Sequence, residues 1–251
     1  MFLKALILST TLLCAAEGAE GGKVLSVRTD SWMPFNGEPG AEKPGYVIEI
    51  LKEIFEPAGI KVDYQTKPYK ESLDAARKGE VDAVIGANAA EAEDLLMPAK
   101  SIGAPCVVLL TLDHSGFDYQ NMRSLMKVKL GIIEGYSYWP ALDNYITQKK
   151  NLVVEGGETP LDALFQKLQK GEIEVLAENE PVLMWYLRAH KLDKKDFRAV
   201  YRHMADPIYV VFAKTADGKA HSERLDKGLQ ALRSSGRLLR ILDKYGLSDW
   251  E

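Results

Sequence analysis

Cysteine is scarce in this sequence, with only two residues in 251. One of them, Cys14, lies in an N-terminal apolar segment that we expect to be removed, so Cys106 has no partner for an internal disulfide. The four histidines are scattered without the spacing of a metal site, and we find no phosphate-binding loop and no paired nucleophile and base. The sequence therefore predicts no cofactor and favours a binding protein over an enzyme.

Positive charge is not concentrated anywhere in the chain. Lys and Arg number 32 against 36 Asp and Glu, the two signs are interspersed, and the net charge is -4. Proteins that bind nucleic acid commonly carry a basic stripe or patch. We therefore expect no nucleic-acid partner.

Long apolar runs are also missing, apart from one near the N-terminus. Residues 5–13 are mostly apolar, Lys4 precedes them and small residues follow. The run is too short to span a bilayer, and the pattern is typical of a secretory signal peptide. We predict that residues 1–16 are such a peptide and that the mature protein is periplasmic. Because Leu13 is bulky where lipid attachment at Cys14 would need a small residue, we favour this over a lipoprotein.

Predicted strands and helices alternate along the chain. Runs of strand length are followed by apolar residues at helical spacing, with Gly or Pro between them. We expect strands at 23–28, 60–64, 81–85, 128–133, 152–155 and 208–213. We expect helices at 46–55, 69–79, 139–147 and 181–188, and two more near the C-terminus. Alternation of this kind predicts an α/β fold with mainly parallel sheets.

A weak internal sequence repeat, here called the echo, indicates that the chain has two similar halves. The matching segments are LDAA at 73–76 with KGEVDAV at 78–84, and LDAL at 161–164 with KGEIEVL at 170–176. Each copy is typical of a helix that ends at Gly, followed by a strand and a loop that carries Asn.

The echo predicts two facing lobes. We assign 23–109 together with 207–251 to lobe 1, and 110–206 to lobe 2. Two apolar runs, 107–110 and 208–212, are expected to carry the chain from one lobe to the other.

Polar and aromatic residues follow the predicted strands. Gly86 and Asn88 come directly after one strand, and Asn179 takes the same place in the echo. Ligands of open α/β sheets collect at the carboxyl ends of strands. Trp32 comes after the first strand, which Pro34 ends, so we expect it to be exposed in the loop.

Six short segments follow one another over nearly the whole mature chain: WMPF at 32–35, GYVIEI at 45–50, GEVD at 79–82, MP at 97–98, EGYS at 134–137 and the stretch 236–246. In this order they resemble the family 3 extracellular solute-binding proteins, periplasmic receptors that deliver polar amino acids to ABC transporters. The resemblance implies a periplasmic-binding-protein type II fold with two crossover hinge strands that closes over a small polar molecule. It also implies an ABC permease as partner and a monomeric protein.

The resemblance assigns further ligand-binding residues. Trp32 and Tyr69 match aromatic residues that pack on the ligand. Tyr136 and Ser137 match the ligand-binding loop of the second lobe. Asp30 is placed to accept a hydrogen bond from the ligand, or to cap a turn.

Two departures from the family pattern concern the charges that hold an amino acid. The family places an Arg shortly after the loop at Gly86 and Asn88, where it binds the ligand carboxylate, and an Asp for the ammonium group. Here 87–111 contains no Arg, and Asn179 stands in place of the Asp, with Glu178 beside it. We therefore expect Glu178 and Asn179 at the site.

An acidic run, 91–94, stands where the Arg is expected, and we interpret it as the solvated start of a helix. Without the two charges, the ligand is expected to be a neutral or cationic amine, amide or heterocycle. Standard L-amino acids should not bind tightly unless Arg123, Arg188 or Arg202 replaces the missing cation.

Two other functions remain open at this point. A few relatives of these receptors are enzymes, among them the periplasmic cyclohexadienyl dehydratases, and in that case Glu178 or Glu180 would serve as a general acid. The protein could also be the soluble ligand-binding partner of a sensor.

Overall fold

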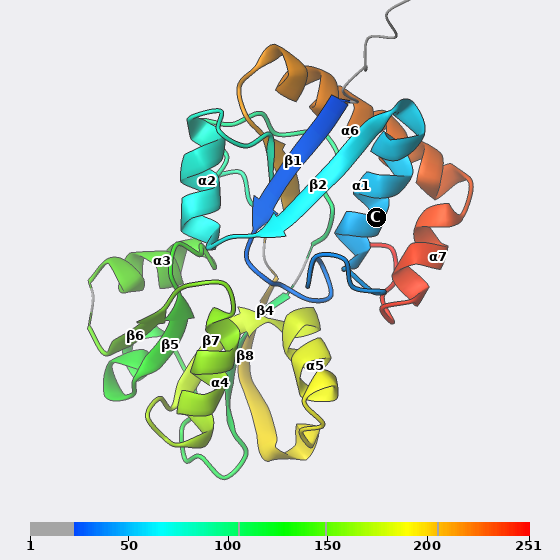
Figure 1. Cartoon of the computed structure of the whole chain (residues 1–251). Helices are drawn as coiled ribbons and strands as arrows, with labels where there is room; N and C mark the ends of the chain where they lie inside the picture. The colour runs from blue at the N-terminus through cyan, green and yellow to red at the C-terminus, as the bar shows by residue number, and fades with distance from the viewer. Residues whose placement is uncertain (1–22, 105, 149, 205) are drawn as a thin grey trace, which may run out of the picture.

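A computed structural model describes residues 23–104, 106–148, 150–204 and 206–251. The predicted signal peptide, 1–16, lies outside the described residues. The chain forms two α/β lobes, each with its own sheet, and it passes between them twice (Figure 1). Within the described part of the chain, no helix is both long and apolar enough to cross a membrane.

The sheet of lobe 1 has the strand order β2-β1-β3-β9. Strand β1 is parallel to β2 and β3, whereas β9 is antiparallel to β3. The strands are β1 (Lys23–Thr29), β2 (Ile60–Thr66), β3 (Ala83–Ala87) and β9 (Tyr209–Phe212). The helices are α1 (Tyr46–Phe55), α2 (Tyr69–Arg77), α6 (Ala216–Ser234) and α7 (Arg237–Asp243), with a 3-10 turn at Glu56–Ala58.

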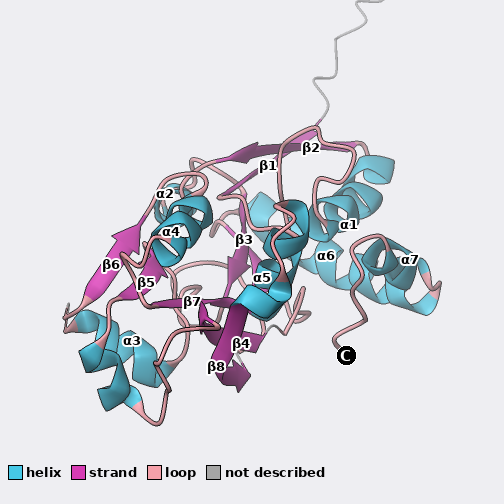
Figure 2. Cartoon of the chain, turned by 90° about the horizontal axis from the view of Figure 1, so that it is seen from below, coloured by secondary structure: helices cyan, strands magenta, loops and turns pink. Residues whose placement is uncertain are grey.

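Side-chain alternation along β3 explains why helices cover both faces of this sheet. Ala83 and Ile85 join the core cluster beneath α1, α6 and α7, whereas Val84 packs with Leu73 of α2 on the opposite face. An irregularity between Ile85 and Ala87 breaks the alternation, so Ala87 lies on the same face as Val84. Successive residues of a strand point to opposite faces, so a strand buried on both sides is apolar throughout. Figures 1 and 2 show α1, α6 and α7 on one side of the sheet and α2 on the other.

The sheet of lobe 2 has the order β6-β5-β7-β4-β8. Strand β5 is parallel to β6 and β7, and β4 is antiparallel to β7 and β8. The strands are β4 (Cys106–Leu112), β5 (Leu130–Ile133), β6 (Leu152–Glu155), β7 (Val175–Asn179) and β8 (Phe197–Met204). The helices are α3 (Pro140–Thr147), α4 (Pro160–Gln169) and α5 (Glu180–Ala189), with 3-10 turns at Met122–Lys127 and Lys194–Asp196.

The two passages between the lobes run side by side. The Ile102 N–H donates to the Ile208 carbonyl over 2.8 Å, and the Ile208 N–H donates to the Gly103 carbonyl over 2.9 Å. The expected boundary at 109/110 needs correction, because it falls inside β4, all of which belongs to the sheet of lobe 2. We therefore propose that lobe 2 begins near Cys106.

Strand β8 is missing from the sequence prediction. In its sequence, FRAVYRHM, Arg198 and Arg202 flank only three consecutive apolar residues, so neither a long apolar run nor a strict alternation appears. β8 lies at the edge of its sheet and is mostly half-buried, a position that tolerates polar side chains.

Candidate functional site

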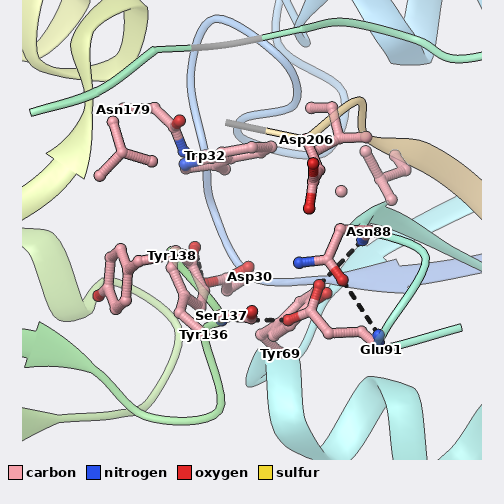
Figure 3. A pocket seen from close by; sticks show the side chains of 14 residues that line it. Asp30, Trp32, Tyr69, Asn88, Glu91, Tyr136, Ser137, Tyr138, Asn179 and Asp206 are labelled. Atoms are coloured by element: carbon pink, nitrogen blue, oxygen red, sulfur yellow. Dashed lines mark hydrogen bonds between the residues drawn. The ribbon is translucent and has the colours of Figure 1, made fainter. Parts of the chain in front are cut away.

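The candidate site is a cavity between the lobes, at the carboxyl ends of parallel strands from both sheets (Figure 3). All the site residues predicted from the sequence line it except Glu178: Asp30, Trp32, Tyr69, Gly86, Asn88, Tyr136, Ser137 and Asn179. Sequence reasoning missed Ile85, Glu91, Val107, Tyr138, Asp206 and Ile208. The cavity is small: the volume in which the centre of a water molecule fits is about 40 Å³. This is room for a few waters.

Trp32 forms one wall of the cavity but is not the exposed aromatic predicted from the sequence. Its backbone N–H donates to the Asn36 carbonyl over 2.8 Å, and this turn brings Phe35 onto its ring, with the centroids 4.0 Å apart. Only 6% of Trp32 is exposed, and it belongs to the core cluster of lobe 1. The residue therefore serves both the cavity and the core.

Gly86 packs under the Trp32 ring. Its φ is +98°, and a Cβ at this position would lie 3.1 Å from the Trp32 ring. A side chain there would be strained by the backbone and crowded by the indole. Glycine is thus required for the close approach of β3 to this wall.

Asp30 follows β1 and is almost fully buried at the cavity. Its Oδ2 accepts a 2.8 Å hydrogen bond from the Tyr136 hydroxyl of lobe 2. Burial raises the pKa of Asp30 to about 7, although the hydrogen bond from Tyr136 opposes this rise. The acceptor role predicted for Asp30 is thus filled by the protein itself.

Glu178 is the penultimate residue of β7. It lies behind the cavity wall and is fully buried. Its Oε1 accepts from the Trp32 Nε1–H of lobe 1 over 3.2 Å and from the Asn179 backbone N–H over 2.6 Å. Burial raises the pKa of Glu178 to about 7. Its other oxygen, Oε2, and the Asn179 Oδ1 are buried and have no hydrogen-bond partner among the described residues.

Glu91 corrects our interpretation of the acidic run. Glu93 and Asp94 are exposed as expected, but the run forms turns and not the start of a helix, and Glu91 turns inward and lines the cavity. Its Oε2 accepts from the Asn88 backbone N–H over 2.9 Å, and its Oε1 from the Ser137 backbone N–H over 3.3 Å. Burial raises the pKa of Glu91 to about 7.

A local signal in the sequence could have found Glu91. The Asn88 Oδ1 accepts from the Glu91 backbone N–H over 3.1 Å, while the Glu91 carboxylate returns to the Asn88 N–H. This reciprocal pair, with Asn and Glu three residues apart, is the pattern of a capping box.

Three tyrosines complete the cavity wall. The rings of Tyr69 and Tyr136 meet edge to face at 5.2 Å, and those of Tyr136 and Tyr138 lie 6.2 Å apart. The Tyr138 hydroxyl accepts a 2.9 Å hydrogen bond from the Ile133 N–H, which fixes its position. With Trp32, the tyrosines give the cavity an aromatic lining of a kind that attracts cations.

Cations are missing from the described part of the cavity wall, where no Lys or Arg occurs. Arg202 forms an ion pair with Glu180 over 3.0 Å, and the Arg188 Nε donates to the Met184 carbonyl within its own helix. Neither residue lines the cavity. Within the described ranges, no group of three His, Cys, Asp or Glu is arranged to hold a metal ion.

No protein-family model and no curated protein matches this chain. Solved structures do match it over most of its length. An ancestral arginine-binding protein bound to arginine has a TM-score of 0.74 and 15% identity, covering 89% of this chain and 98% of that one. A substrate-binding protein of an ABC uptake transporter from Streptococcus pneumoniae, with bound histidine, has a TM-score of 0.74 and 16% identity, covering 90% and 94%.

A third match is a histidine kinase sensor domain with similarity to periplasmic binding proteins. Its TM-score is 0.71 at 21% identity, covering 90% of this chain and 96% of that one. These matches are consistent with an arrangement of two lobes, each with its own sheet. The chain has the two-lobed fold of the periplasmic binding proteins, which confirms the fold predicted from its sequence.

Proposed function

We propose that this protein is an extracytoplasmic solute-binding protein that encloses a small polar ligand between its lobes for delivery to an ABC importer. The observation that carries this proposal is the cavity between the lobes, beside which the Glu178 Oε2 and Asn179 Oδ1 are buried without partners. A buried acceptor without a partner costs roughly 1 to 3 kcal/mol. A ligand that donates hydrogen bonds to both atoms would remove this cost.

The ligand proposed is small and rich in N–H donors. The cavity combines acidic groups with an aromatic lining and has no cation among its described residues. Its 40 Å³ is less than a ligand of several heavy atoms needs, so the lobes must part slightly to admit one. An amine or amide fits this chemistry better than an anion.

Export to the periplasm, a monomeric state and an ABC permease as partner belong to the same proposal. They are supported by the predicted signal peptide at 1–16 and by the likeness in fold to substrate-binding proteins of ABC transporters. One match is a sensor domain, so crosslinking in membranes of the source cell should separate the two partners. A transporter subunit among the crosslinked proteins supports delivery, and a sensor kinase supports signalling.

Mass spectrometry of small molecules released from the purified protein by denaturation tests the binding function. We expect one small polar compound at near-stoichiometric amounts, which raises the melting temperature when it is added back. At a hundredfold excess over Kd it should stabilise the protein by about 2.7 kcal/mol. If no compound is released, and a library of amines, amides, amino acids and nucleobases produces no shift, the proposal is wrong.

A second candidate function is an enzyme on the same fold, and Glu178 is the observation that favours it. A fully buried carboxyl with a pKa of about 7 can exchange a proton near neutral pH, as a general acid must. Glu180 is paired with Arg202 instead. If the released compound is converted by the protein, and Glu178→Gln binds it without converting it, the enzyme function replaces the transport function.

A further inference from the structure

Three of the hydrogen-bond donors around the cavity are already used by the protein's own carboxylates. Trp32 Nε1 donates to Glu178, and the Tyr136 hydroxyl donates to Asp30. The Ser137 hydroxyl donates to Asp143 over 2.8 Å, away from the cavity. A ligand that needs donors, such as a carboxylate, finds these groups occupied.

Two further donors, the backbone N–H groups of Asn88 and Ser137, converge on a single carboxylate. They come from opposite lobes, one following β3 and the other following β5, and both end on Glu91. Two backbone N–H groups that point at one place form an anion-binding position. Here a side chain of the chain itself fills that position.

Two of the groups left without partners have the opposite chemistry. The Asn179 Oδ1 accepts hydrogen bonds only, the Glu178 Oε2 does so when its carboxyl is ionised, and the Asn179 amide is oriented by its Nδ2–H bond to the Glu178 Oε1 over 3.3 Å. Asn179 lines the cavity and is only 7% exposed. Asp206 adds another carboxylate to the lining. The Tyr69 hydroxyl is also buried without a partner and can donate, so the described cavity wall offers acidic and amide acceptors but no cationic donor.

We propose that Glu91 is a specificity-determining residue that fills the anion-binding position of the cavity, so that the site selects amines without a carboxylate over the corresponding amino acids. This inference rests on the proposed binding function and names the substrate class. The amine group would donate to Asn179 and Glu178 while Trp32 and Tyr136 pack against its alkyl or cationic part. An α-carboxylate would have to displace Glu91 from two N–H groups and enter an acidic cavity.

Three matched pairs of probes, each differing by one carboxylate, test this inference: putrescine with ornithine, cadaverine with lysine, and agmatine with arginine. Calorimetric titration should show at least one amine binding about tenfold or more tightly than its amino acid, a factor that corresponds to one charge-assisted hydrogen bond at the low end of its range. Glu91→Ala opens the two N–H groups and removes a negative charge, so this preference should shrink or reverse. Glu91→Gln keeps the shape and should shift it in the same direction.

Glu93→Ala is the matched control, because Glu93 belongs to the same acidic run but is exposed. The preference of the Glu93→Ala variant for amines over amino acids should equal that of the unmodified protein. The inference is overturned if the unmodified protein binds the amino acids as tightly as the amines, or if Glu91→Ala leaves the preference unchanged. It is also overturned if neither the unmodified protein nor Glu91→Ala binds any of the six probes. The ligand released on denaturation tests the binding function independently of these outcomes.

Discussion

Trp32 carries two roles that the sequence alone suggested were separate. It stacks on Phe35 inside lobe 1 and donates to Glu178 of lobe 2. Replacing a buried Trp with Ala typically lowers the free energy of unfolding by about 3 to 5 kcal/mol. We therefore expect Trp32→Ala to lose both stability, measured by urea denaturation, and ligand affinity, measured by calorimetry.

Trp32→Phe separates the two roles. It keeps an aromatic ring against Phe35 but removes the Nε1–H donor, so it should retain most of the stability and still weaken closure over the ligand. An unfolding free energy of Trp32→Ala equal to that of the unmodified protein would show that the ring is not part of the core.

At the residue scale, the sequence located the site where strands end but not the side chains that turn back into it. Gly86 and Asn88 were predictable because ligands of open α/β sheets collect at the carboxyl ends of strands, whereas Ser137 came from the family resemblance. Glu91 was missed because a charged run is usually solvated, and here the reciprocal bonds with Asn88 draw it inward. Trp32 was placed in the right loop with the wrong exposure, since pattern reasoning does not show how a loop folds onto its own residues.

At the scale of elements, a buried hydroxyl just after α7 connects this end of the chain to the start of α1, beside an ion pair between Lys244 and Glu49. The Tyr245 hydroxyl donates to the Glu49 Oε1 over 2.7 Å and accepts from the Gly45 N–H over 3.1 Å, at the start of α1. Tyr245→Phe leaves that N–H buried without a partner, so we expect the free energy of unfolding to fall by about 1 to 3 kcal/mol. Ligand affinity should not change, because Tyr245 is not at the cavity.

Tyr119→Phe is the control for this substitution. Tyr119 is half-buried, and among the described residues the one hydrogen bond of its hydroxyl goes to the Met122 sulfur, a weak acceptor, over 3.2 Å. Denaturation with urea should show a change of less than about 0.5 kcal/mol for it. If the two variants lose the same amount, the link between α7 and α1 does not depend on this hydroxyl.

Most elements were predictable from apolar periodicity, and the exceptions share a cause. The run 107–110 was predicted to be a crossover between the lobes, but pairing with β7 and β8, which lie far away in sequence, makes it part of the lobe 2 sheet. β8 was missed because an edge strand needs less apolar surface than a central one. In both cases, the place of 107–110 and the existence of β8, pairing between strands far apart in sequence decides the structure, and the local pattern does not show it.

At the scale of the whole molecule, three buried carboxyls make stability depend on pH in an unusual direction. The pKa values of Asp30, Glu91 and Glu178 are about 7 in the folded chain, against about 4 in an unfolded one. Between these values the folded state binds more protons, so the free energy of unfolding falls as pH rises. We expect the melting temperature of the ligand-free protein to be higher near pH 5.5 than near pH 8.

Asp30→Asn should flatten this dependence in a calorimetric pH series, because it removes one of the three groups. Below pH 4 stability should fall again, since the pKa of Asp63 and that of Asp249 are lowered by their hydrogen bonds with Arg28 and Arg233. A melting temperature that rises steadily from pH 5.5 to pH 8 would contradict the raised pKa values.

The three bonds that cross the cavity to Asp30, Glu91 and Glu178 also have a consequence for charge balance. Below pH 7 a cation that enters the cavity should favour the ionised carboxylates and expel protons, so binding becomes an exchange of one positive charge for another. Calorimetry in buffers of different ionisation enthalpy should detect about one proton released per cation bound near pH 6. The occupied and the empty protein would then carry nearly the same net charge and migrate alike in an electric field. A membrane partner could tell them apart only by their shape.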